Sequence, residues 1–237
     1  LSYEFFLYKN LNIFSFLLII FIIGFLSDLK ILNDPRKRFF IQFILIILSV
    51  YLLDITIFKT RVFPLDIMLE NKINNYFFVV FCLMVLLNGS NFIDGINTLT
   101  IGYYIVILII LNFVPEFTQE NLIDINIFYI LIYLLILNLL GIIILGDAGA
   151  YIISLYFGIN LIEFSNLSQS ISPFFIILLL WYPCFELLFS MIRRLNSKNR
   201  SYKPDLKHLH QLLFFRLILI NSFGKKTNHF ISSFLIN

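Results

Sequence analysis

Charged residues are scarce in this chain and make up only 13% of its 237 residues. Soluble globular domains carry about a quarter charged residues. The 60% hydrophobic composition therefore excludes an ordinary soluble domain and indicates an integral membrane protein. Cysteine is also nearly absent, and Cys82 and Cys184 both lie inside apolar runs. We expect them to be small buried side chains and not a disulfide or a metal-binding pair.

The chain also lacks a short signal segment with a cleavage site, an internal repeat and a low-complexity block. It begins with Leu1 instead of Met, and it stops a few residues into a new apolar run, HFISSFLIN. We therefore expect a piece of a longer protein, without its N-terminal helices and its C-terminal end.

Long apolar runs are the main feature that is present. A membrane-spanning helix needs about 20 mostly apolar residues, and every span should be helical because lipid offers no partner to backbone polar groups. The third and sixth runs are short, so we expect them to borrow flanking residues, or to be tilted or partly re-entrant. The sequence predicts one all-α, multi-pass transmembrane bundle over 1–237, with about seven spans and a truncated eighth. The seven predicted spans are 11–26, 39–58, 76–87, 99–114, 125–145, 150–164 and 173–192.

The basic residues are distributed unevenly between the two sides of this predicted bundle. Thirteen of the 17 Lys and Arg residues lie on the side that the chain reaches after its first span, most of them in a basic loop over 193–228. Since basic loops face the cytoplasm, we assign that side to the cytoplasm. Four polar clusters reach the same side: SDLKILNDPRKR, NGSNFIDGIN, LGDAGAY and PDLKHLHQLL.

Two of these clusters contain candidate ligands for a cation. Asn88, Asn91 and Asp94 are spaced three residues apart and share a face if the helix continues through them. Two amides and a carboxylate suit Mg²⁺, which prefers oxygen ligands, but a helix end followed by an Asn/Gly turn explains the same residues. Asp147 lies between two glycines where two spans meet, and an ordinary N-cap is the alternative for it.

The other two clusters are basic or contain histidine. Arg36, Lys37 and Arg38 suit a phosphate group, or equally the headgroups of anionic lipids. Gln42, one turn into the following span, is unusual in lipid and is expected to face a polar pocket. For His208 and His210 we favour contact with a phosphate or nucleotide over a structural metal, and surface histidines in a basic loop remain the alternative.

Two acidic residues, Asp54 and Glu186, lie inside predicted spans. An acid within the membrane is a functional hypothesis by default. Both lie toward the ends of their spans, where a side chain reaches water at low cost. We therefore predict that both are peripheral to any site.

The order of the four clusters resembles that of the polyprenyl-phosphate N-acetylhexosamine-1-phosphate transferases, which are glycosyltransferases of family 4. The matching elements are GFLSDLKIL with PRKRFFIQ, then NGSNFIDGIN, LGDAGAY and HLHQLL. The histidine segment is closest to the branch that transfers GlcNAc 1-phosphate to undecaprenyl phosphate. The resemblance implies transfer of a sugar 1-phosphate from a UDP-sugar to a polyprenyl phosphate at the cytoplasmic face of a bacterial inner membrane. UMP leaves, Mg²⁺ is the cofactor, and the product serves cell-envelope polysaccharide synthesis.

The resemblance also implies roles for particular residues. Asp28 matches the second of a pair of aspartates near the lipid phosphate, and Asp147 matches the aspartate that binds Mg²⁺. Asp28, Asp94 and Asp147 are the implied catalytic residues. The implied substrate-binding residues are Arg38, Gln42, Asn88, Asn91, Asn97, His208 and His210. A nucleic-acid partner is not expected, and a homodimer is left open.

The chain departs from the family pattern at two positions. Ser27 replaces the first of the paired aspartates, and Gln211 stands where a third histidine is common. These departures keep open a non-catalytic relative that binds lipid or nucleotide. A transporter is a weaker alternative because transporters place their binding groups near the middle of the bilayer, whereas these clusters lie at one surface.

Overall fold

In the computed structural model, residues 2–114, 125–167, 171–196 and 208–220 are described. Within those ranges all regular secondary structure is α-helical, as predicted. The chain forms two compact units, Leu1–Leu87 with Gly146–Leu179, and Asn88–Leu145 with Leu180–Asn237. We call them unit 1 and unit 2.

Unit 1 is built from two separate parts of the sequence. Its helices are α1 (Ser2–Asp28), α2 (Pro35–Leu52), α3 (Phe63–Leu69), most of α4 (Lys72–Ile93), α8 (Gly146–Leu167) and α9 (Pro173–Leu179). Unit 2 contains the end of α4 together with α5 (Leu99–Asn112), α7 (Ile125–Leu139), α10 (Trp181–Asn196) and α11 (Leu209–Ile220).

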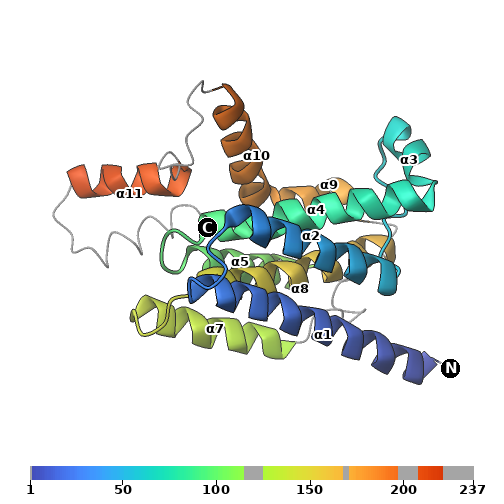
Figure 1. Cartoon of the computed structure of the whole chain (residues 1–237), viewed down its shortest axis with the longest axis horizontal. Coiled ribbons are helices and arrows are strands. Elements are labelled where there is room, and N and C mark those ends of the chain that lie inside the picture. Colours follow the sequence, from blue (N-terminus) through green and yellow to red (C-terminus); the bar gives the residue numbers. More distant parts are fainter. Residues whose placement is uncertain (1, 115–124, 168–170, 197–207, 221–237) are drawn as a thin grey trace. The chain divides into compact units, whose positions relative to one another are not determined.

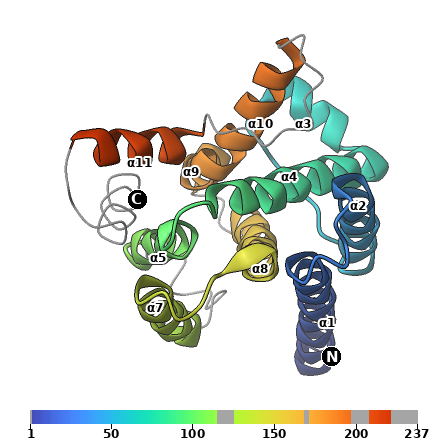
Figure 2. The same ribbon diagram turned by 60° about the vertical axis from the view of Figure 1, so that its left-hand side comes forward.

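The core of unit 1 is formed by α1, α2, α4 and α8, and α1 lies along α8 (Figures 1 and 2). Ile20, Ile46, Val79 and Tyr151, one from each helix, are fully buried in it. Gly24 marks the closest approach, because a Cβ atom added there would lie 2.4 Å from the Cα of Ala148. A side chain at position 24 would therefore force α1 away from the beginning of α8.

The first turn of α2 carries the basic cluster and has a defined start. Asp34 is the N-cap, and its carboxylate accepts the backbone N–H of Arg36 at 2.9 Å. Pro35 follows at the first helical position, where its missing N–H costs nothing. This cap fixes where α2 begins and therefore where Arg38, one turn later, is placed.

The segment that follows α2 is extended, and three side chains hydrogen-bond it to the rest of unit 1. Asn75, which is 5% exposed, accepts the N–H of Ile57 and donates to the carbonyls of Ile57 and Leu69. Asn166 accepts the N–H of Phe58, and Asp66 accepts from Thr60. These hydrogen bonds satisfy backbone N–H and C=O groups that have no partner within a helix.

In unit 2, α5 packs along α7 (Figure 1). The chain enters α5 through Thr98, which has a left-handed backbone (φ 71°), an outlier for a β-branched residue. Asn138, at the end of α7, accepts the N–H of Thr98 at 2.6 Å and donates to the carbonyl of Ile143 at 3.0 Å. Asn138 thus supports the turn that follows NGSNFIDG.

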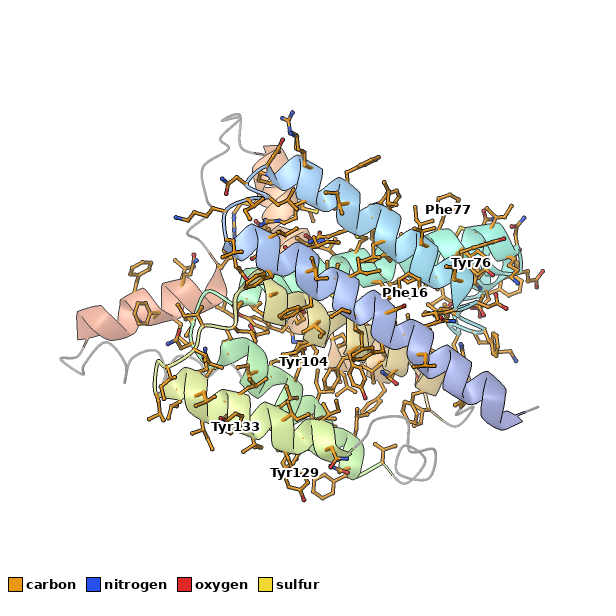
Figure 3. The ribbon with its side chains drawn as sticks, turned by 60° about the horizontal axis from the view of Figure 1, so that its bottom comes forward. Phe16, Tyr76, Phe77, Tyr104, Tyr129 and Tyr133 are labelled. Carbon is orange, nitrogen blue, oxygen red and sulfur yellow. The ribbon has the colours of Figure 1, made fainter. Side chains whose placement is uncertain are left out.

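Many large apolar side chains are exposed, as expected for a surface that faces lipid. Phe77 on α4 and Tyr129 and Tyr133 on α7 are each more than 60% exposed (Figure 3). Three described helices, containing Leu11–Asp28, Lys72–Ile93 and Gly146–Leu167, are long and apolar enough to cross a membrane. A fourth is added if α9 and α10, which a break at Leu180 separates, form one span.

Each of the seven predicted spans contains helix, but the second runs past the end of α2 at Leu52 and the seventh is divided between α9 and α10. The count of seven spans stays a prediction. The short third and sixth runs are 22-residue helices, because both extend into the polar clusters beside them. The first turn of α2 carries three basic residues, and α5 and α7 have only 14 and 15 residues. The structure adds α3 and α11, which were not predicted, and α11 lies within the predicted basic loop 193–228. The start of the predicted eighth span lies outside the described residues.

Candidate functional site

The candidate site in unit 1 begins where the end of α1 meets the start of α8. The carboxylate of Asp28 accepts the N–H of Asp147 at 2.9 Å and the N–H of Ala148 at 3.1 Å. The first N–H groups of a helix have no partner within it, and the positive end of its dipole attracts anions. Asp28 therefore caps α8 from a distant part of the sequence.

The glycine before Asp147 makes this cap sterically possible. Gly146 has a left-handed backbone (φ 66°), and a Cβ atom added there would lie 2.7 Å from an oxygen of Asp28. Asp147 is thus not the N-cap that the sequence left open as an alternative. It lies in the first turn of α8, with its backbone held by Asp28 and its side chain directed to other partners.

The side chains of Ser27, Arg38 and Asp147 form one hydrogen-bonded cluster. The hydroxyl of Ser27 donates to Oδ2 of Asp147 at 2.6 Å and accepts from Nη1 of Arg38. Nη1 of Arg38 also lies 2.6 Å from the same oxygen of Asp147. Three of the sequence-predicted residues, Asp28, Arg38 and Asp147, are therefore brought together with Ser27.

This cluster is partly buried, which strengthens its charge interactions relative to those on an open surface. The side chains of Arg38 and Asp147 are 25% and 20% exposed. The guanidinium balances one of the two carboxylates, so the four side chains carry a formal charge of −1. A partly open site with one excess negative charge can accept a cation together with an anionic substrate.

Gln42 lies one turn after Arg38 and was predicted to face a polar pocket. Its side chain is fully buried, and no hydrogen bond of ordinary geometry reaches its amide nitrogen or its carbonyl oxygen within the described residues, although the hydroxyl of Tyr151 lies close to it. A buried amide left unsatisfied costs about 1–3 kcal/mol, so Tyr151 or a polar ligand beside Arg38 is needed to supply the missing bonds.

The asparagine–aspartate segment lies in unit 2, where the structure places its members in two environments. Asn88 and Asn91 are half-buried in the last two turns of α4, while Asp94 and Asn97 follow the end of the helix at Ile93. The helix therefore continues through the two asparagines and ends before Asp94, so the shared face applies only to the asparagines. Because Asp94 belongs to the other unit, its convergence with Asp28 and Asp147 stays a prediction.

The histidine segment reveals a residue whose role was predicted wrongly. Glu186 is only 4% exposed, so it is not peripheral as its place near the end of a span suggested. Oε2 of Glu186 lies 2.9 Å from Nδ1 of His208, and Oε1 accepts the N–H of Leu209 at 3.0 Å. The other acid, Asp54, is 64% exposed and pairs with Lys72, as expected of a peripheral residue. His210 lies in α11, and its side chain is outside the described part.

Glu186 could have been found from helical periodicity. Tyr182, Glu186 and Ser190 recur every four residues in α10 and are all buried. Polar groups on one face of an apolar helix indicate a polar interior partner. Ser27 was noted in the sequence only as a missing carboxylate, and a single sequence has no signal for its contacts with Arg38 and Asp147.

The residues present in unit 1 fit Mg²⁺ as a partner. Asp28, Asp147 and Ser27 offer only oxygen atoms, which Mg²⁺ prefers. No group of three or more His, Cys, Asp or Glu side chains suited to a metal occurs in the described part of the chain. Mg²⁺ does not need such a cage, since it is commonly bound by one or two carboxylates together with substrate phosphates and water.

A separate hollow lies at the other end of unit 1, with a volume of about 370 Å³. It is lined by residues of the extended segment after α2 and of α3 and α4, including Asp54, Asp66 and Lys72. Two of its three acidic groups already have partners, because Asp54 pairs with Lys72 and Asp66 accepts from Thr60, and the third, Glu70, is exposed. We therefore place the candidate site at the junction of α1, α2 and α8.

Two comparisons with known proteins find relatives of this chain. The sequence profile of glycosyl transferase family 4 matches residues 10–165, which include Ser27, Arg38 and Asp147. An undecaprenyl-phosphate alpha-N-acetylglucosaminyl 1-phosphate transferase of Thermotoga maritima is 24% identical over 210 residues. That alignment covers 84% of this chain and 60% of the relative's length. No solved structure matches the chain. Since the profile covers well over half of its residues, the chain belongs to glycosyl transferase family 4.

Proposed function

We propose that this protein transfers a sugar 1-phosphate, of the N-acetylhexosamine type, from a UDP-sugar to a polyprenyl phosphate such as undecaprenyl phosphate. The observation that carries the proposal is the cluster of Ser27, Asp28, Arg38 and Asp147, which joins two predicted site segments that are about 120 residues apart in the sequence. The name of the Thermotoga relative supports the reaction class, and family membership supports a glycosyltransferase.

In the proposed reaction, a phosphate oxygen of the polyprenyl phosphate attacks the β-phosphorus of the UDP-sugar. The bond from that phosphorus to the oxygen bridging to the α-phosphorus breaks, and UMP leaves with the electron pair. The products are UMP and a polyprenyl diphosphate sugar. Such a transfer depends mainly on alignment and on neutralising charge.

The chain's own residues supply positioning and charge for this reaction. Arg38 is the cation placed to attract a phosphate, and Asp147 holds its guanidinium in position at 2.6 Å. Asp28 or Asp94 would accept the remaining proton of the lipid phosphate. Asp28 uses two acceptor sites on the start of α8, and a carboxylate has about four, so it can still accept that proton.

The proposed cofactor is Mg²⁺, with Asp147 as its principal ligand and Asp28 and Ser27 close to it. When bound, the ion would offset the negative charge of the diphosphate. The proposed nucleotide-sugar contacts are Asn88, Asn91, Asn97, His208 and His210, and Gln42 would hydrogen-bond a polar group beside Arg38.

The proposed location is a bacterial inner membrane, with the site facing the cytoplasm. The contact of Asp28 with Asp147 places the C-terminal end of α1 beside the N-terminal end of α8, as the predicted alternation of spans requires. Arg38, at the beginning of α2, reaches the same place. The abundance of basic residues on that side supports its assignment to the cytoplasm.

A non-catalytic relative that binds lipid or nucleotide is the second candidate function. The observation that favours it is the absence of a carboxylate at position 27, where Ser27 makes a neutral hydrogen bond to Asp147. Such a protein would bind the same two substrates without releasing UMP.

The experiment that tests the proposal measures UMP release by the purified protein in mixed micelles with UDP-GlcNAc, undecaprenyl phosphate and Mg²⁺. We expect release that depends on all three additions. Substrate binding without release would favour the non-catalytic candidate, and neither binding nor release would contradict both. Other UDP-hexosamines in the same assay would identify the preferred sugar.

A further inference from the structure

The buried carboxylate of Glu186 joins α10 to the beginning of α11. It makes a 2.9 Å contact with Nδ1 of His208 and accepts the N–H of Leu209 at 3.0 Å. The backbone carbonyl of His208 accepts the N–H of Leu212, so His208 is the N-cap residue directly before α11. Glu186 therefore holds both the side chain of His208 and the first N–H of the helix.

Burial makes these two contacts necessary for the carboxylate. The side chains of Glu186 and His208 are only 5% and 6% exposed. A buried carboxylate is stable only where hydrogen bonds or opposite charge replace its hydration. Glu186 obtains two such contacts from the segment that carries the histidines.

The contact also determines which nitrogen of His208 faces elsewhere. An ionised carboxylate can only accept hydrogen bonds, so Nδ1 of His208 must carry a proton to bond with Glu186. With Nδ1 held in this way, the orientation of the ring and the direction of Nε2 are fixed. A histidine whose proton position and ring orientation are fixed by a carboxylate is prepared to act through its second nitrogen.

A third segment of unit 2 completes this arrangement. The ring of Phe92, in the last turn of α4, lies 5.4 Å from the ring of His208. Phe92 lies between Asn91 and Asp94 in the asparagine–aspartate segment. His208 is thus held by Glu186 on one side and touches that segment on the other.

We propose that Glu186 is a positioning residue, which fixes the ring of His208 and the start of α11 beside Phe92 for the contact of the histidine segment with the nucleotide-sugar. The proposal rests on the proposed function for the identity of the substrate. The orientation itself rests only on contacts within unit 2, so it can be tested without any substrate.

The first test uses ¹⁵N-histidine labelling and the ring-nitrogen shifts of the purified protein. The sequence has three histidines, and the signal lost in a His208→Asn variant identifies His208. We expect Nδ1 of His208 to be protonated in the wild type, and we expect that preference to be lost in Glu186→Met, which keeps the side-chain length but has no oxygen to accept from Nδ1. A wild-type His208 with its proton only on Nε2, or an unchanged shift in Glu186→Met, would overturn the proposal.

The second test compares the steady-state kinetics of Glu186→Gln with those of the wild type. The control is Glu70→Gln, which makes the same substitution at an exposed residue. A misplaced catalytic contact costs up to about 100-fold in rate. We expect kcat per folded protein to fall about 10- to 100-fold in Glu186→Gln. KM should change less than threefold, which corresponds to about 0.6 kcal/mol. Glu70→Gln should behave as the wild type.

Two further outcomes separate the explanations. If Glu186→Met or Glu186→Gln does not fold, Glu186→Asp replaces it. We expect Glu186→Asp to retain the protonated Nδ1 of His208 and to show a smaller fall in kcat. A wild-type kcat in Glu186→Asp together with an altered tautomer of His208 would contradict the positioning role. If the wild type transfers no sugar phosphate but shows the Glu186-dependent tautomer, the proposed function fails while the orientation of His208 by Glu186 is upheld.

Discussion

A hydroxyl group, not a carboxylate, lies between Arg38 and Asp147. Ser27 donates to Asp147 and accepts from Arg38 without adding charge. A second carboxylate at this position would lie against Oδ2 of Asp147 and would need an additional cation. The single substitution at position 27 therefore sets how much negative charge the site offers to Mg²⁺.

The Ser27→Asp variant should bind Mg²⁺ more tightly than the wild type. An added charge about 4 Å from the ion contributes about 1 kcal/mol even in water-like surroundings, so the half-saturating Mg²⁺ concentration should fall at least about fivefold. Titration of UMP release with Mg²⁺ measures this, supported by displacement of Mn²⁺ followed by electron paramagnetic resonance. Asn71→Asp adds the same charge at the start of α4 and should change nothing. A half-saturating concentration that rises or stays constant in Ser27→Asp would refute this account of Ser27.

Sequence reasoning found Asp28, Arg38 and Asp147 but not how they contact one another. Their residue types and their place in the order of clusters were sufficient to single them out. The bonds that join them connect positions more than 100 residues apart, and no local pattern encodes those pairs. Glu186 was misjudged for a related reason, because its distance from the end of a span does not reveal whether its helix face is covered.

At the scale of elements, the close approach of α1 to α8 is the feature that holds the site together. Gly24 permits it, and the cap from Asp28 is built one turn later on the same helix. The sequence predicted both spans within a few residues. It did not predict their pairing, since the apolar faces of membrane helices are chemically alike.

Gly24→Ala should separate these two helices and weaken both stability and turnover. The added methyl would meet the backbone of Ala148 at 2.4 Å, and overpacking of this kind costs about 1–3 kcal/mol. We expect a lower Tm in detergent and reduced UMP release. Ile22→Ala alters an exposed residue of the same helix and should leave both nearly unchanged. A wild-type Tm and activity in Gly24→Ala would show that the helices do not approach as closely as described.

The segment after α2 should loosen at acid pH through Asp66. Hydrogen bonds from the hydroxyl and the backbone N–H of Thr60 lower the pKa of Asp66 below its ordinary value near 4. Because the folded pKa is the lower one, this carboxylate stabilises the segment above the unfolded pKa, and that stabilisation is lost as the pH falls through the folded pKa. Hydrogen exchange at Thr60 should therefore accelerate below about pH 4. Asp66→Asn should exchange faster at neutral pH and lose this dependence, and equal protection of Thr60 in both proteins across the range would argue against the role of Asp66.

At the scale of the whole molecule, composition and charge distribution predicted an all-helical protein and the approximate position of most of its helices, but not the break between α9 and α10 within the seventh predicted span. They could not predict that α4 and α8 continue into their polar clusters, because Asn, Ser and Gly weaken the helical signal there while tertiary contacts maintain the helix. They also could not divide the residues between two units. That division places Asp28, Arg38, Gln42 and Asp147 in unit 1 and the asparagine and histidine segments in unit 2.

The transfer of phosphate together with sugar is the central claim, and the fate of the β-phosphorus tests it most directly. The protein is incubated with undecaprenyl phosphate, Mg²⁺ and UDP-GlcNAc labelled with ³²P at the β-phosphate, followed by extraction of the lipid. The account predicts label in the lipid fraction, formation of an equal amount of UMP, and loss of both in Asp147→Asn. Label that remains in the aqueous phase while sugar enters the lipid, or full activity in Asp147→Asn, would contradict it.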